Sequence, residues 1–75
     1  MKRNELKRLA KEIASLQIEL DNVKEEDTFL KNFYENAIVE ASSKVSGKTP
    51  EERLEAMVVL DEMIQKYIKK QNAKS

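Results

Sequence analysis

The sequence contains neither cysteine nor histidine, and it has only one glycine and one proline. Without cysteine there is no disulfide, no thiol nucleophile and no thiolate metal ligand, and the absence of histidine removes the commonest general base. The sequence also lacks the apolar run of a signal peptide and the run of about 20 apolar residues that spans a membrane. We therefore expect a cytoplasmic protein that is not an enzyme, does not bind membranes and holds neither a metal ion nor a cofactor.

Aromatic residues and net charge are scarce as well. Aromatic residues make up 5% of the 75 residues, whereas charged residues make up 37%, and fourteen Lys and Arg balance fourteen Asp and Glu. A chain without net charge has no general attraction for nucleic acids or anionic membranes. Many charged and aliphatic residues with almost no turn formers are typical of long helices, so we expect an all-α fold.

The most regular pattern is an apolar stripe within residues 6–24, whose members are spaced alternately three and four positions apart. This spacing is typical of a coiled-coil seam, and charged or polar residues fill most of the positions between. We call these residues the seam: Leu6, Leu9, Ile13, Leu16, Leu20 and Val23.

The same phase continues beyond the seam through Asp27 and Leu30, which favours one helix from about residue 4 to residue 45, with Asn4 as its N-cap. In the alternative, Asp27 or Thr28 caps a second helix. That alternative gives a three-helix bundle with a break near residues 24–28.

The clearest boundary lies in the stretch VSGKTPEER. Gly47 suits the left-handed residue that ends a helix, Thr49 is a good N-cap, Pro50 suits the first helical position, and Glu52 completes a capping box. We expect the last helix to run from about residue 50 to residue 71.

A link this short predicts an antiparallel helical hairpin over residues 25–75, with residues 1–24 protruding as a coiled-coil arm. The lysines of the last helix would then face the acidic segment 21–27. The return helix would end near residue 24 and leave the seam from Leu6 to Leu20 in water, which forgoes on the order of 10 kcal/mol of apolar burial. We therefore expect a homodimer through the seam, parallel or antiparallel, within a single helical domain.

A basic patch near the amino end suggests an alternative function, a helical dimer that binds nucleic acid. Glu5 and Glu12 dilute the patch, and no aromatic residue interleaves it. The basic patch consists of Lys2, Arg3, Lys7, Arg8 and Lys11.

The stretch GKTPEERLEAMVVLDEMIQKY resembles the second helix of the small aspartyl-phosphate phosphatases of the sporulation phosphorelay. The resemblance covers under a third of the chain and implies an antiparallel helical hairpin, with phosphatase activity on a phosphoaspartyl group as a further alternative. At residues 57–59, Met-Val-Val replaces the family's Ser-Gln-Glu, which removes the polar surface that such activity needs. The matching residues are Gly47, Leu60, Asp61, Ile64 and Tyr67.

The function that these patterns favour is a small regulatory protein of the adaptor, assembly-factor or inhibitor kind, such as bacteria and their mobile elements encode as short chains. It would bind itself and an unidentified protein partner. Beyond residue 28 the apolar face widens, and aromatic and Met side chains there suit a partner surface, although they equally suit a core. The candidate partner surface is Phe29, Phe33, Met57 and Met63.

Overall fold

Three helices make up the fold of residues 2–74, which is the part of the chain that the computed structural model describes. Helix α1 spans Arg3–Asp21, α2 spans Thr28–Ser42 and α3 spans Pro50–Lys74. No strand occurs within residues 2–74, so the all-α prediction is confirmed. The element order is that of the three-helix alternative.

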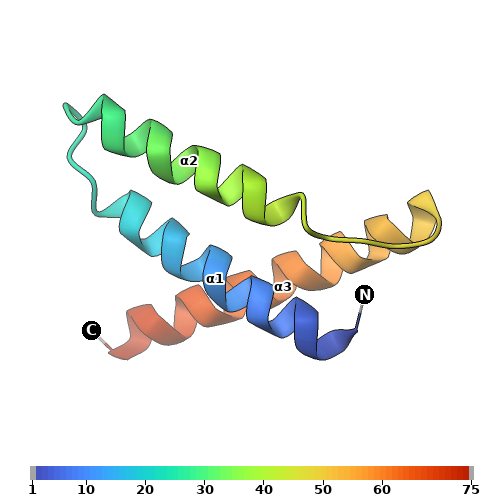
Figure 1. The fold of residues 1–75 in the computed structure, drawn as a ribbon. Helices are drawn as coiled ribbons and strands as arrows, with labels where there is room; N and C mark the ends of the chain where they lie inside the picture. The colour runs from blue at the N-terminus through green and yellow to red at the C-terminus, as the bar shows by residue number, and fades with distance from the viewer. Residues whose placement is uncertain (1, 75) are drawn as a thin grey trace.

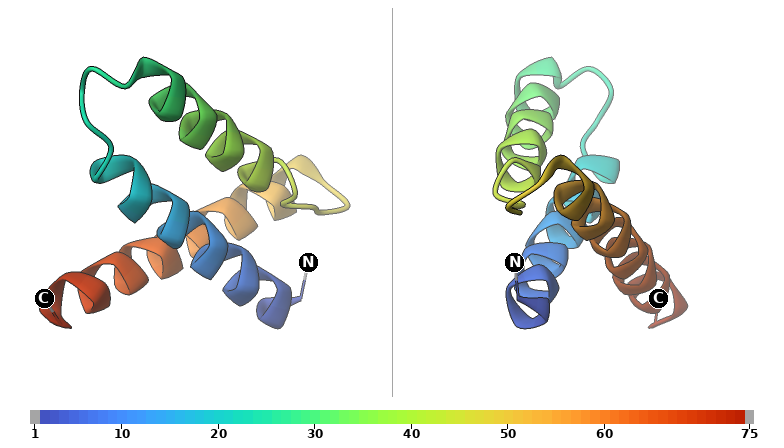
Figure 2. Two further views of the ribbon diagram at one scale, coloured as in Figure 1. Left: turned by 60° about the vertical axis from the view of Figure 1, so that its left-hand side comes forward. Right: turned by 90° about the vertical axis from the view of Figure 1, so that its right-hand side faces the viewer.

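Helix α1 is the central element. In Figure 1, α2 runs back antiparallel beside α1, and α3 crosses α1 on another side. Figure 2 shows the crossing of α1 and α3 as an X. Both α2 and α3 pack on α1, but in the part of the chain that is described they do not pack on each other. An antiparallel hairpin is therefore present, but α1 and α2 form it, and the expected hairpin of α2 with α3 is wrong.

The expected single helix over residues 4–45 is also wrong, because α1 ends at Asp21 and a non-helical segment precedes α2. Asp27 is the N-cap of α2, and its Oδ1 accepts a hydrogen bond from the backbone N–H of Leu30 at 3.1 Å. In a continuous helix, Asp21 and Glu25 would be like-charged neighbours four positions apart, which destabilises a helix. Carboxylates just before α2 instead lie at the positive end of its dipole.

The start of α3 is the boundary that the sequence predicted best. Thr49 Oγ1 accepts a hydrogen bond from the backbone N–H of Glu52 at 3.1 Å. The Glu52 carboxylate in turn accepts one from the backbone N–H of Lys48 at 2.9 Å. These two bonds satisfy N–H groups that have no partner within the helix. The predicted first helical residue, Pro50, is confirmed.

Two local expectations are corrected. Helix α1 begins at Arg3 with Lys2 as its N-cap, not Asn4. Gly47 does not adopt a left-handed conformation, since its φ is not positive. A Cβ atom at Gly47 would lie 2.9 Å from the backbone nitrogen of Arg53, so the glycine is needed for the close approach of the link to the first turn of α3.

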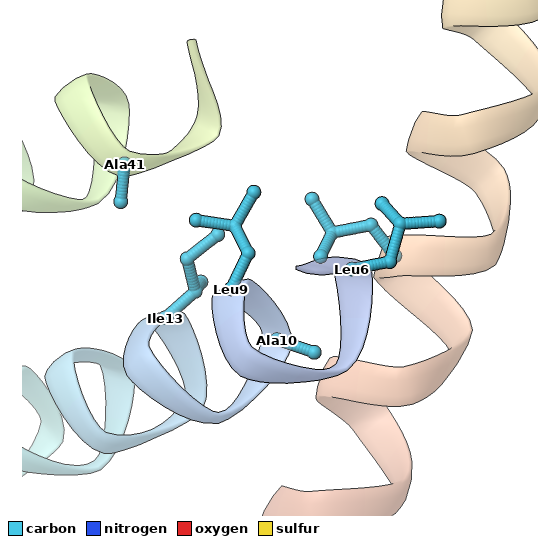
Figure 3. Close-up of a cluster of buried hydrophobic side chains, with 6 residues drawn as sticks. Leu6, Leu9, Ala10, Ile13 and Ala41 are labelled. Atoms are coloured by element: carbon cyan, nitrogen blue, oxygen red, sulfur yellow. The ribbon is translucent and has the colours of Figure 1, made fainter. Parts of the chain in front are cut away.

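The core lies where the three helices meet at α1. Figure 3 shows Leu9 and Ile13 of α1 pointing toward Ala41 of α2, with Leu6 nearer to α3. Ala10 is fully buried, and its small side chain permits the close crossing of helices. The buried cluster consists of Leu6, Leu9, Ala10, Ile13, Ala41 and Leu60.

The chain's own helices cover the seam of α1. The first three seam residues are only 3–6% exposed, and the last three are partly buried. The expectation of an uncovered arm is therefore wrong, because α3 crosses α1 and buries side chains that a second copy was expected to shelter. The buried group is Leu6, Leu9 and Ile13, and the partly buried group is Leu16, Leu20 and Val23.

The fold is open for its length. Its radius of gyration is 13.3 Å, whereas a compact chain of this length has about 11 Å. The chain exposes 6021 Å², whereas a compact protein of this mass exposes about 4,700 Å². The shortest principal dimension is 15 Å, about the thickness of two packed helices. This shape leaves a large surface for association.

Candidate functional site

Among the described residues, the most exposed large apolar side chain lies on α2. Phe29 is 79% exposed, and Phe33, one turn later, is 58% exposed. Asn32 and Asn36 share this side of the helix by their spacing and are also exposed. We call these four residues the phenylalanine face.

The phenylalanine face carries no charge. The charged residues of α2 are Lys31, Glu35 and Glu40. By helical spacing, Lys31 lies on the opposite side of α2 and Glu35 on a flank, whereas Glu40 lies one turn beyond Asn36 and borders the face at its carboxyl end. The centres of protein–protein interfaces contain few charged residues. The phenylalanine face shares this property, although 37% of the residues of the whole chain are charged.

Tyr34 fixes α2 next to this face. Its ring meets that of Phe33 edge to face, with the ring centroids 5.5 Å apart and an interplanar angle of 80°. A hydrogen bond with the Glu19 carboxylate of α1 raises the pKa of Tyr34, and the negative charge of Glu19 adds to the shift. The phenylalanine face is therefore held by ring contacts and by a polar tie to α1.

A second exposed apolar region lies on the first half of α3. Leu54, Met57 and Val58 are 65%, 50% and 53% exposed, whereas Met63 is partly buried and packs against the core. The candidate partner surface is thus divided between two helices that do not pack on each other: Phe29 and Phe33 lie on α2, and Met57 lies on α3. Met63 packs against the core, which was the alternative to a place in the partner surface.

A basic trough lies along the crossing of α1 and α3. Two hollows, of 660 Å³ and 340 Å³, share Lys7, Tyr67 and Lys70 in their linings. Lys11 lines the larger hollow, and its Nζ lies 5.8 Å from the centroid of the Tyr67 ring. The smaller hollow adds two further cations. We call the following residues the basic trough: Arg3, Lys7, Lys11, Lys66, Tyr67 and Lys70.

The fold separates the charges of a neutral chain into two regions. Residues 2–11 and 63–73 hold eight Lys and Arg against the single carboxylate of Glu5, whereas residues 12–62 hold five against thirteen. The crossing of α3 over α1 brings the two basic segments together. The lysines of α3 therefore do not face the acidic segment 21–27 as predicted, because Lys66 and Lys70 line a hollow with Arg3 and Lys7.

Three of the five residues in the predicted basic patch take part in the trough, namely Arg3, Lys7 and Lys11. The other two, Lys2 and Arg8, are exposed and do not line it. The contribution of α3 was missed, although the sequence carries a signal for it: after Glu62, residues 63–75 contain lysines but no acidic residue.

The chain has few of the side chains that catalysis and metal binding commonly use, since it contains neither His nor Cys. Within residues 2–74, no three acidic side chains are placed together to hold a metal ion. None of the three helices, as described, has the length and apolar character needed to cross a membrane. Asp61, the acidic residue of the phosphatase resemblance, is exposed on α3.

Comparison with protein families, with curated proteins and with solved structures finds no match to this chain.

Proposed function

We propose that this protein acts without chemistry, as a helical interaction module that forms a homodimer through the phenylalanine face. The observation that supports it most is the excess of exposed surface. The chain exposes 6021 Å², about 1,300 Å² more than a compact protein of its mass. A standard interface buries about 800 Å² on each partner, so the excess is sufficient for one.

A second copy suits the phenylalanine face better than a charged partner does. In a two-fold symmetric dimer the same patch meets itself, so a patch with charges of one sign would repel its copy. The phenylalanine face contains no charge, and the amide side chains of Asn32 and Asn36 both donate and accept hydrogen bonds. The face is therefore self-complementary, whereas the basic trough would repel its own copy.

The expected dimer is of moderate affinity. Burying one Phe side chain is worth about 1.5–3 kcal/mol, so the four rings of Phe29 and Phe33 in two copies contribute on the order of 10 kcal/mol. Association costs about 4–15 kcal/mol. At the low end of that cost a net gain of about 6 kcal/mol remains, which corresponds to a Kd of roughly tens of micromolar. This dimer replaces the one through the seam, whose residues Leu6, Leu9 and Ile13 lie in the core of a single chain.

Sedimentation velocity across the micromolar range tests the proposal. The mass of the wild-type protein is expected to rise from 8.7 kDa toward twice that value as the concentration increases. The double variant Phe29→Glu/Phe33→Glu should remain a monomer with unchanged helicity, because both side chains are exposed and neither belongs to the buried core cluster.

The matched control is Leu54→Glu/Val58→Glu on α3. These residues have the same four-residue spacing and are similarly exposed, at 65% and 53%. The control should dimerise like the wild type. Equal loss of dimer in both variants, or a wild-type mass that stays at 8.7 kDa throughout, would contradict the proposal.

A further inference from the structure

We propose that the basic trough binds single-stranded nucleic acid through its phosphate backbone. This inference does not depend on the homodimer, because it concerns the crossing of α1 with α3 and not the phenylalanine face of α2. It rests on three properties of the trough: its unpaired charge, the spacing of its cations and the position of Tyr67.

The positive charge of the trough is not neutralised by the chain. Among the described residues, the ion pair that forms joins Lys44 Nζ and Glu12 Oε1 at 4.0 Å, and it lies outside the trough. None of the five cations of the trough forms an ion pair with another described residue. Like charges held together repel each other, so their juxtaposition favours binding of a polyanion. One carboxylate, Glu19, lines the far end of the larger hollow and is engaged with Tyr34.

The cations form two regular rows. Arg3, Lys7 and Lys11 follow one another at four-residue intervals on α1, which places them about 6 Å apart along the helix axis. Lys66 and Lys70 have the same interval on α3. Such rows match a polymer that carries one charge per repeat unit. A single strand that is partly unstacked spaces its phosphates more widely than the 3.4 Å per nucleotide of a duplex strand.

Tyr67 adds an aromatic ring between the two rows. It lines both hollows and is partly buried, with Lys11 beside its ring. An aromatic side chain beside a cationic track is the combination by which proteins hold single strands without reading their sequence. A cluster of cations alone would also suit an acidic peptide. The ring of Tyr67 within the trough is the feature that favours a strand with bases to stack.

Fluorescence anisotropy with a labelled oligothymidine of about twelve nucleotides tests the inference on the full chain. Binding is expected at about 20 mM salt, and the logarithm of the association constant should fall with the logarithm of salt concentration with a slope of about −3.5 for five contacts. The variant Lys7→Gln/Lys70→Gln should bind about tenfold more weakly and reduce the slope to about −2.

The matched control is Lys24→Gln/Lys48→Gln, which removes the same charge from exposed positions outside the trough. It should bind like the wild type, and circular dichroism should show equal helicity in all three proteins. No binding at low salt, or equal weakening by the control, would overturn the inference. Displacement by polyglutamate as effective as by unlabelled oligonucleotide would overturn it as well, since the site would then accept any polyanion.

Discussion

Helices α1 and α2 both carry apolar side chains at helical spacing, but the structure uses them in opposite ways. On α1, Leu6, Leu9 and Ile13 are 6%, 5% and 3% exposed, whereas Phe29 and Phe33 on α2 are 79% and 58% exposed. The aliphatic stripe of α1 is buried when the single chain folds. The aromatic stripe of α2 is not needed for folding, so it is free for association.

The difference follows from the number of neighbours that each helix has. α1 packs on both other helices, whereas α2 packs on α1 alone. One neighbour covers one side of a helix, and the only residue of α2 that is buried outright is the small Ala41. The sides of α2 that remain are left to solvent or to a partner.

The largest difference between the two stripes should appear when a charged side chain is introduced into each of them. Ile13→Lys places an unpaired ammonium in the core, and we expect a loss of about 3–5 kcal/mol, enough to abolish cooperative unfolding in urea followed by circular dichroism. Phe33→Lys removes only the edge-to-face contact with Tyr34, so the free energy of unfolding of the monomer should fall by about 1 kcal/mol. Comparable damage from both substitutions would mean that the Phe33 side of α2 belongs to the core.

The separation of α2 from α1 depends on the cap at Asp27. Asp27→Ala removes the acceptor for the backbone N–H of Leu30, and we expect the unfolding free energy to fall by about 1 kcal/mol. Asp27→Ser retains a capping oxygen and should lose only a few tenths of a kcal/mol. Urea denaturation of the three proteins measures both effects. A fully stable Asp27→Ala variant would show that the break does not need this cap.

The lysine side of α1 should behave differently from its leucine side, because the trough cations repel one another. Lys7→Gln/Lys70→Gln is expected to raise the free energy of unfolding by a few tenths of a kcal/mol at low salt. The gain should disappear when salt screens the charges. A thermal melt at two salt concentrations measures it, and a destabilised variant would mean that the lysine stems contribute packing.

The smallest expected effect concerns the tie between α1 and α2. Glu19→Gln removes the carboxylate that raises the pKa of Tyr34, so this pKa should fall back toward its ordinary value of 10.0. Because the folded pKa is raised, the contribution of the tie is present below about pH 10 and is lost as pH rises through the folded pKa. Tyrosinate absorbance in a Tyr67→Phe background follows this change, since Tyr34 is then the only tyrosine and the chain has no Trp. An unchanged titration curve would show that Tyr34 is not tied to Glu19.

Composition and caps sufficed to predict the helical class and the start of α3. Thr49, Pro50 and Glu52 encode that start locally, through hydrogen bonds between near neighbours. The exposed positions of Phe29 and Phe33 were predicted as one of two possibilities. The single helix over residues 4–45 was wrong because the regular apolar phase through Asp27 was favoured over the alternative in which Asp27 caps a second helix.

The apolar sequence pattern also did not predict which helix α3 packs on. A short link suggested that α3 would lie along α2, but Ala10 on α1 provides a shallow surface on which α3 crosses instead. An alanine is compatible with either side of a helix, so its role at a crossing is visible only in three dimensions. The α3 side of the basic trough was missed for the same reason, since Lys66 and Lys70 meet Arg3 and Lys7 only through that crossing.

The shortest dimension of the molecule, 15 Å, has one more consequence. In so thin a body every peptide group is close to bulk water, so depth gives little protection from deuterium uptake, and helix opening alone sets the rate. Any partner that settles on one helix will therefore slow uptake there and leave the other two nearly unchanged. A footprint of this kind would map the docking of a dimer mate and of an oligonucleotide to different helices in a single sample.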